Sequence, residues 1–417
     1  MTMRNILLAV AAAILTSLVS RAAELSSGSA EQRISRYSVI WNTPSKDASG
    51  QMPIGNGDIA AGVYAIENGD LYLLLAKNDA YTYQGDLFKT GRVRISLDPN
   101  PFKSGKPFRQ TLDLPTGSVR IEADAVTLLI WADARRPVCH VQIISPHDIA
   151  VTARPEFWKR FDHCPSNQQG YTPAGAKDGA EPTPDVAGLQ YCLDGLLALK
   201  AGTKENQARW QRFRGEIPEL YLRTSEGRQA IAPARKWEHQ SNMENAELYA
   251  VFPFRCFGLA HGSGDLVAWT MKQRTVKDAF NSACWTQDQI HWAYAGNATE
   301  AADGLVRRFR VASPMCRFPL FGREGPDSCP DFDHFGAGSI ALQRMLVQEA
   351  GAKILLLPAW PADWDVDFTL RVSQRTILTG TVKAGRLTTW DTHPASRKKD
   401  VVVGQPQPRK PLGPVVK

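Results

Sequence analysis

The feature that most constrains the fold of this chain is a change in hydrophobic spacing along its length. From about residue 37 to 145, short apolar runs are separated by Gly, Pro, Asn and Asp, which is typical of strands joined by turns. From about 186 to 350 the apolar residues recur at helical spacing, and strand-like runs return from 353. This order predicts a multidomain α+β protein.

The first region predicts an N-terminal antiparallel β-sandwich domain over 24–155. Its runs mix strict alternation with fully apolar stretches, as two sheets packed face to face require. The next segment, 156–186, is rich in Gly, Pro and polar residues, which favours a linker or long loop. The strands expected in the sandwich lie near 70–76, 92–97, 118–123, 128–133 and 138–145.

The region 187–352 is expected to be a helical domain, and Gly351 fits the C-cap of its last helix. A small C-terminal β domain is expected over 353–402, followed by a disordered tail over 403–417. The expected helices lie near 189–199, 206–217, 247–260, 265–276, 288–298, 300–309 and 338–350. The expected C-terminal strands lie near 354–359, 366–372, 376–382 and 386–392.

The first 23 residues are typical of a secretory signal peptide. Arg4 precedes an apolar run over 6–19, and small residues at positions 20 and 22 favour cleavage after Ala22 or Ala23. The run is shorter than the roughly 20 apolar residues that span a bilayer, although an uncleaved anchor is the alternative. We therefore expect a secreted or periplasmic protein that has no membrane contact after cleavage.

The formal net charge of +7 results from 49 Lys and Arg against 42 Asp and Glu. The dense basic runs lie at 397–399 and 409–410, near the end of the chain. We interpret them as solvated tail, so no nucleic-acid partner is expected.

The chain has seven cysteines, so at least one of them is unpaired or bonded elsewhere. Cys316 and Cys329 flank a Gly/Pro-rich loop and are the first candidates for a disulfide, with buried free thiols as the alternative.

The eight histidines show no metal-ligand spacing, and no metal or cofactor is expected. Gly55–Ala60 fits G-x-G-x-x-A, but without a following helix a turn with positive φ explains these glycines better.

Two groups of acids next to aromatic residues are the candidate catalytic residues. Asp331 and Asp333, with His334, open the last expected helix, and Glu238 and Glu244 precede an earlier one. Cleavage of a glycosidic bond needs two carboxylates, one that protonates the leaving oxygen and one that activates water or attacks directly. The alternative to a catalytic role for Asp333 is a structural one, as the N-cap of the helix.

Aromatic faces suit the C–H surfaces of sugars, although core packing is the more frequent role for any one tryptophan. The tryptophans considered for sugar stacking are Trp285, Trp292, Trp360 and Trp364.

Three stretches together resemble one family, the bacterial α-L-fucosidase-like enzymes of glycoside hydrolase family 95, and within it an uncharacterised secreted branch. The stretches are 41–43 with 52–58 (MPIGNGD), 244–254 (ENAELYAVFPF), and 331–336 (DFDHFG) running on to 355–361 (LLLPAWP). The resemblance covers most of 37–155 and 190–402.

The resemblance implies a β-sandwich, an (α/α)6 barrel and a small C-terminal β domain. It implies inverting hydrolysis of a fucoside or related oligosaccharide or polysaccharide, with carboxyl groups about 6.5–9.5 Å apart. Asp333 takes the place of the family's catalytic aspartate, with Asp331 as second choice. Glu238 is the candidate general acid, with Glu244 in reserve. The residues expected to bind substrate are Trp285, His334, Trp360 and Asn245.

The chain departs from the family where the first barrel hairpins belong, because only a loop-like segment precedes Leu189. The sequence also has Asp-His-Phe-Gly where the fucosidases have Asp-Gly-Asn-Phe-Gly, a shift of one residue. We therefore expect an incomplete barrel with an open cleft, which weakens the positioning that catalysis needs. Two alternatives remain: a non-catalytic carbohydrate-binding remnant, and a damaged gene product without a stable function.

Overall fold

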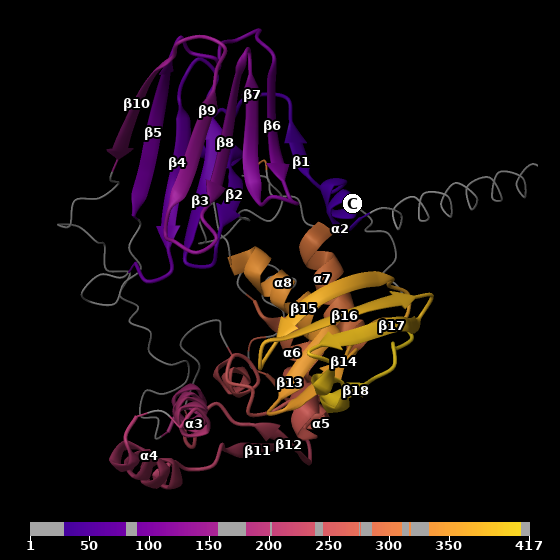
Figure 1. Cartoon of the computed structure of the whole chain (residues 1–417). Helices are drawn as coiled ribbons and strands as arrows, with labels where there is room; N and C mark the ends of the chain where they lie inside the picture. The colour runs from indigo at the N-terminus through magenta and orange to yellow at the C-terminus, as the bar shows by residue number, and fades with distance from the viewer. Residues whose placement is uncertain are drawn as a thin grey trace, which may run out of the picture. The chain divides into compact units, whose positions relative to one another are not determined.

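The structure is a computed structural model that describes residues 29–80, 90–156, 181–200, 202–237, 245–274, 276, 286–310, 317 and 333–409. The chain divides into two compact units (Figure 1). The first contains Met1–Cys164 and Met315–Phe318, and the second contains Pro165–Pro314 and Pro319–Lys417. The prediction of a mixed α+β chain with an antiparallel, sandwich-like N-terminal part is confirmed.

The first unit contains two five-stranded antiparallel sheets. One sheet has the order β1 (Val39–Trp41), β6 (Phe108–Asp113), β7 (Ser118–Ala123), β8 (Val126–Ala132) and β9 (Cys139–Ile144). The other has the order β10 (Ala150–Glu156), β5 (Gly91–Asp98), β4 (Leu71–Lys77), β3 (Ile59–Ala65) and β2 (Met52–Gly55). The short helix α2 (Ala30–Ser35) and the 3-10 turn η1 (Ala48–Gly50) complete the described elements of this unit.

Alternation along the strands explains how the sheets pack. In β7 the buried positions are Val119, Ile121 and Ala123, each fully buried, and the residues between them are partly exposed. Leu128 and Ile130 repeat this pattern in β8, which contacts β2 and β3 of the other sheet. Each sheet therefore turns its apolar face inward, as the sequence pattern predicts.

The strand β10 is absent from the sequence-based expectation. It pairs with β5 at one edge of its sheet, and most of its residues are exposed on both faces. An edge strand with two solvated faces has no hydrophobic alternation that a sequence pattern could report.

The turn expected at Gly55–Ala60 joins β2 to β3, and Gly57 adopts φ +92° there. Asn56 fixes this turn through both ends of its side-chain amide. Its Oδ1 accepts hydrogen bonds from the Asp58 and Ile59 amides at 2.9 Å, and its Nδ2 donates to the Asp133 carbonyl at 2.7 Å. The motif therefore ties a hairpin turn to the β8–β9 loop.

The second unit begins with helices and a hairpin. Its elements are α3 (Thr183–Ala198), α4 (Lys204–Glu216), β11 (Leu222–Ser225), β12 (Arg228–Ile231), η2 (Ala246–Ala250), η3 (Leu259–His261), α5 (Gly264–Gln273), α6 (Asp288–Tyr294), α7 (Ala298–Arg310) and α8 (Asp333–Leu346). The β11–β12 hairpin has no counterpart in the sequence-based expectation. The helix expected over 247–260 is wrong, because this stretch forms only the short 3-10 turns η2 and η3.

Two small sheets follow α8. In the first, β13 (Val347–Ala350) pairs antiparallel with β14 (Lys353–Leu356), which pairs parallel with β18 (Val401–Val403). The second consists of β15 (Val366–Val372), β16 (Thr376–Lys383) and β17 (Arg386–His393), and the 3-10 turn η4 (Ala395–Asp400) follows. The expected continuation of the last helix to 350 is wrong, since Val347–Ala350 is a strand and Gly351, at φ +58°, lies in the turn after it.

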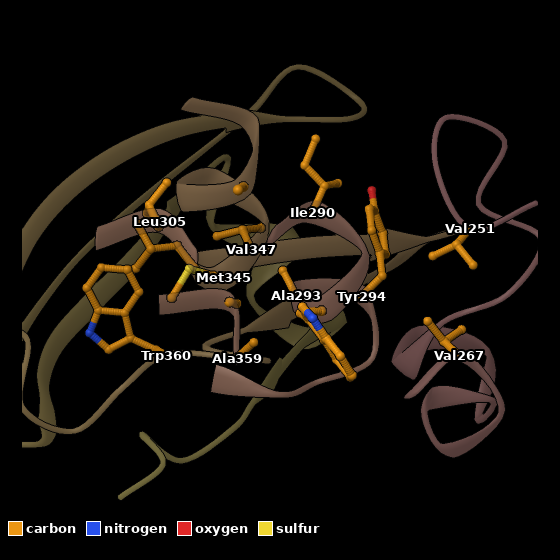
Figure 2. Packing of buried hydrophobic residues seen from close by; sticks show 14 of the residues in the cluster. Val251, Val267, Ile290, Ala293, Tyr294, Leu305, Met345, Val347, Ala359 and Trp360 are labelled. Atoms are coloured by element: carbon orange, nitrogen blue, oxygen red, sulfur yellow. The ribbon is translucent and has the colours of Figure 1, made fainter. Parts of the chain in front are cut away.

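The helices and the C-terminal strands of the second unit share one hydrophobic core (Figure 2). Its members include Val267 of α5, Ile290 of α6, Leu305 of α7, Met345 of α8 and Val347 of β13. Burial of these side chains provides most of the stabilisation of the unit. None of the helices in the described part of the chain is long and apolar enough to cross a membrane.

The prediction of a disordered tail over 403–417 is wrong for residues 403–409, because Val403 ends β18 and residues 404–409 pack onto the second unit. Gln407 exchanges backbone hydrogen bonds with Trp360 and Ala362, and its side chain donates to the Gly296 carbonyl at 2.8 Å. Arg409 pairs with Asp303 at 2.5 Å and Asp363 at 2.7 Å, and its side chain is only 4% exposed. Arg409 therefore does not belong to a solvated basic tail.

Cys139, Cys192 and Cys256 have free thiols. Cys316 and Cys329 lie outside the described residues, so their disulfide stays a prediction.

Candidate functional site

The structure describes only part of the predicted site. Glu238, Glu244, Asp331 and Trp285 lie outside the described residues. Asp333 and His334 are described by their backbone alone, in the first turn of α8. Asn245 and Trp360 are described in full.

Described residues that adjoin three of these predicted site residues are linked to one another within the second unit. Asn245 follows Glu244, Thr286 follows Trp285, and α8 begins at Asp333. A set of buried polar side chains connects these three points. We call it the polar cluster, and it consists of Arg274, Asp288, Gln289, His291 and Arg308, which are buried or nearly so.

Arg274, just beyond the end of α5, is the link to Asn245. Its Nη2 donates to Asp288 Oδ2 at 2.6 Å, with side-chain exposures of 8% and 14%. Its Nε donates to the Val276 carbonyl at 3.0 Å, and its Nη1 donates to the Met271 carbonyl. The carboxylate and two carbonyls thus satisfy a cation that would otherwise be costly to bury.

Asn245 takes up a structural role at this position. Its Nδ2 donates to the Val276 carbonyl at 3.0 Å, and its Oδ1 accepts from the Val276 amide at 3.0 Å. Both ends of the side chain are therefore engaged by backbone, with one donor hydrogen and one lone pair left over, and the contact of Asn245 with substrate stays a prediction.

Arg308 of α7 provides the link to Thr286 and α8. Its side chain is fully buried, and its Nη2 donates to the Thr286 carbonyl at 2.5 Å and lies 3.4 Å from Gln289 Oε1. On the other side, its Cδ lies 3.2 Å from the place that a Cβ at Gly338 would occupy. Arg308 therefore packs against α8 about one and a half turns beyond Asp333.

His291 is the neutral member of the polar cluster. Neither ring nitrogen has a hydrogen-bond partner within the described ranges, and the residue is only 6% exposed. Burial, helped by the charge of Arg274, lowers the pKa of His291 to about 3. The imidazole is uncharged at neutral pH, so it adds no cation to the two arginines.

Trp360 is a core residue. It is 2% exposed, its Nε1 donates to the Trp364 carbonyl at 3.0 Å, and its ring meets that of Trp364 edge to face at a centroid distance of 5.6 Å. Such a ring has almost no face left for a sugar, so the predicted stacking role of Trp360 is replaced by packing in the core (Figure 2). Trp292, 9% exposed, also belongs to this core.

The polar cluster can order the ends of several helices, and its sequence signal is weak. Sequence reasoning missed Arg274, His291 and Arg308 because each interrupts an otherwise helical pattern without forming a motif. A polar residue on the apolar face of an expected helix was the available signal.

Among the residues that the structure describes, no group of three His, Cys, Asp or Glu could hold a metal ion.

One family model matches this chain, mainly over the first unit. Residues 40–184 match the N-terminal model of a family described as a domain of unknown function, DUF5703. The match runs from β1, through both sheets of the sandwich, to the start of α3. A comparison with curated proteins gave no match.

Proposed function

We propose that the chain is a secreted or periplasmic protein of the α-L-fucosidase-like glycoside hydrolase type, which acts on an oligosaccharide or polysaccharide. The observation that carries the proposal is the polar cluster. It links Asn245, which follows Glu244, and Thr286, which follows Trp285, to α8 at Gly338, five residues beyond Asp333. A two-carboxylate mechanism requires two acids near one another, and we propose that Asp333 and an acid of the segment before Asn245 provide them.

In the proposed reaction Asp333 removes a proton from water, and the water attacks the anomeric carbon. Glu238 gives its proton to the departing glycosidic oxygen, so the configuration at the anomeric carbon is inverted. Asp331 and Glu244 are the second choices for the base and the acid. Trp285 and His334 would contact the sugar. No metal or cofactor takes part in these steps.

The proposed architecture is an incomplete (α/α)6 barrel. The described part of the second unit contains six α-helices, α3 to α8, whereas a complete barrel of this type is built from six helical hairpins. The small sheets β13–β18 close the same core and take the place of a C-terminal β domain.

A second function, carbohydrate binding without cleavage, is favoured by a specific observation. The described part of the second unit contains six α-helices, fewer than six helical hairpins provide, so a cleft built on them is open on one side. A remnant that lost its early barrel would retain a sugar-binding surface and lose the positioning of water.

The test is hydrolysis of aryl fucosides, aryl galactosides and plant oligosaccharides by the full chain and by Asp333→Asn. The matched control is Asp265→Asn, since Asp265 lies in the first turn of α5 as Asp333 does in α8, and is exposed. Activity that falls at least about a hundredfold in Asp333→Asn, and not in the control, supports catalysis. Saccharide binding without turnover supports the second function, and no binding of any saccharide contradicts both.

A further inference from the structure

At the other end of α6 and α8 lies a second group of side chains, which we call the tyrosine–arginine cluster. It consists of Tyr191 of α3, Arg255, Tyr294 of α6 and Arg344 of α8. Gln348 fixes the two helices to each other here, because its Nε2 donates to the Ala293 carbonyl at 2.6 Å and to the Arg344 carbonyl at 3.0 Å. The turn of α8 that contains Arg344 therefore lies beside the end of α6.

Arg255 is presented by the loop after η2. The Cys256 amide donates to the Ala250 carbonyl at 2.7 Å, and Arg255 itself adopts a left-handed φ of +56°. Aromatic rings hold this loop in place. Phe252 stacks on Tyr294 at a centroid distance of 6.5 Å, and Phe254 meets Tyr191 at 6.0 Å. A non-glycine residue in this conformation needs such support from its surroundings.

The cluster contains donors without acceptors. The Nε atoms of Arg255 and Arg344 are buried and make no hydrogen bond, and neither guanidinium forms an ion pair within the described part of the second unit. Tyr294 is 3% exposed, and none of the hydrogen bonds between described residues uses its hydroxyl. Both arginines are partly exposed and only their Nε atoms are withdrawn from water, so a ligand can reach the guanidinium groups and a bound anion would give these donors an acceptor.

Glu349, the acid whose charge acts on Tyr294, is engaged elsewhere. Glu349 Oε1 accepts a hydrogen bond from the Ser373 amide at 2.7 Å. Burial raises the pKa of Tyr294, and the charges of Arg344 and Arg255 oppose that rise only in part. The phenol therefore stays protonated and offers a donor beside the two cations.

We propose that the tyrosine–arginine cluster binds the anionic group of an acidic saccharide, a carboxylate or a sulfate ester. Planar guanidinium groups match both anions, and two of them with a phenol supply several charge-assisted hydrogen bonds. Tyr191, 47% exposed, offers an aromatic face to the sugar ring that bears the anion. This inference rests on the proposed function and narrows its substrate class from saccharides in general to acidic ones.

The subsite is distinct from the proposed point of cleavage. Arg344 follows Asp333 by eleven residues on α8, which corresponds to about 16 Å along the helix axis. The separation is longer than one sugar ring, so the ligand is an oligosaccharide whose charged residue lies away from the bond that is cut.

The test is calorimetric binding of acidic oligosaccharides to the full chain. The panel contains oligomers of galacturonate, glucuronate, mannuronate and guluronate, each with its methyl ester, together with sulfated and unsulfated galacto-oligosaccharides. The ester retains the ring and removes the charge. The variants are Arg255→Gln and Arg344→Gln, with Arg344→Lys to restore the charge and Arg371→Gln, an exposed arginine of β15, as the control.

We expect at least one acidic oligomer to bind tenfold or more tightly than its neutral partner, and each Gln variant to lose about tenfold or more of that affinity. Arg344→Lys should recover part of it, and Arg371→Gln should bind as wild type. A preference for uronates or for sulfated oligomers identifies the anion. Equal binding of charged and neutral oligomers would overturn the subsite and leave the proposed function intact, whereas binding of none would overturn both. Acidic binding without hydrolysis would support the subsite and contradict catalysis.

Discussion

Arg274 and Asp288 form a largely buried ion pair, with Nη2 and Oδ2 separated by 2.6 Å, that joins the end of α5 to the start of α6. The pair fixes the register between two helices whose connecting residues include the predicted Trp285. Arg274 is 8% exposed and makes no second ion pair within the described residues, so loss of Asp288 would leave a buried cation without a counter-ion.

The first prediction concerns this pair. Asp288→Asn should lower the free energy of unfolding by about 3–5 kcal/mol, because Arg274 remains buried without a counter-ion. Chemical denaturation monitored by Trp fluorescence measures the change. Asp194→Asn is the matched control, since Asp194 pairs with Arg214 at 2.8 Å but keeps 59% of its side chain exposed. An equal effect of the two substitutions would contradict the buried pair.

The second prediction concerns pH. His291 has a native pKa of about 3, below its ordinary value near 6.5, so the unfolded chain binds a proton more readily in the window between these values. Stability is therefore full above about pH 6.5 and falls as the pH drops toward 3, by about 2 kcal/mol at pH 5.

His291→Phe keeps a ring of similar shape and should remove this part of the acid sensitivity. His291→Gln serves the same purpose if the Phe variant fails to fold, and exposed His393→Phe is the control. The measurement is the free energy of unfolding from pH 5 to 8. The proposed burial of a neutral imidazole is wrong if the His291 variants show the same pH slope as wild type.

The third prediction tests the packing of Arg308 on α8. A Cβ at Gly338 would lie 2.9 Å from Phe309 Cζ and 3.2 Å from Arg308 Cδ, whereas a Cβ at Gly336 would meet no atom within 4 Å. Gly336→Ala should therefore stabilise the chain by up to about 1 kcal/mol, since alanine favours the helix. Gly338→Ala should gain less or destabilise, because Phe309 and Arg308 must shift. Equal thermal midpoints of the two variants would show that Phe309 and Arg308 do not crowd α8 at Gly338.

Sequence reasoning succeeded where one face of an element is apolar. Val119, Ile121 and Ala123 alternate with polar residues, and they form the inner face of β7 as expected. It failed where tertiary contacts decide the structure. The aromatic-rich stretch 247–260 carries a helical pattern, yet its rings pack on Tyr294 and Tyr191 and its backbone turns twice. Propensity is a weak guide when such packing competes with it.

The candidate site was less accessible to prediction than the fold. Acids and aromatic residues can be recognised as types, but Arg274 follows α5, Asp288 begins α6 and Arg308 lies in α7, and they come together only through the fold. Nothing in the spacing of these residues reveals that α6 and α7 bring them together. The hydrogen bonds between Asn245 and the backbone of Val276 were equally invisible in the sequence, because they depend on how residues 31 positions apart meet in the fold.

The last prediction concerns the C-terminal residues, where composition was misleading. A run rich in Pro, Lys and Arg is typical of a disordered tail. Arg409 nevertheless pairs with Asp303 and Asp363 and lies over the Trp364 ring, 5.3 Å from its centroid. Arg409→Gln should destabilise the second unit by about 3 kcal/mol, because two carboxylates lose a buried cation. Lys398→Gln is the control, since the Lys398–Asp391 pair is exposed, and its midpoint should stay close to wild type. If Arg409→Gln unfolds at the same denaturant concentration as the control, residues 404–409 do not stabilise the second unit. The disordered tail that composition predicts would then be the better description of these residues.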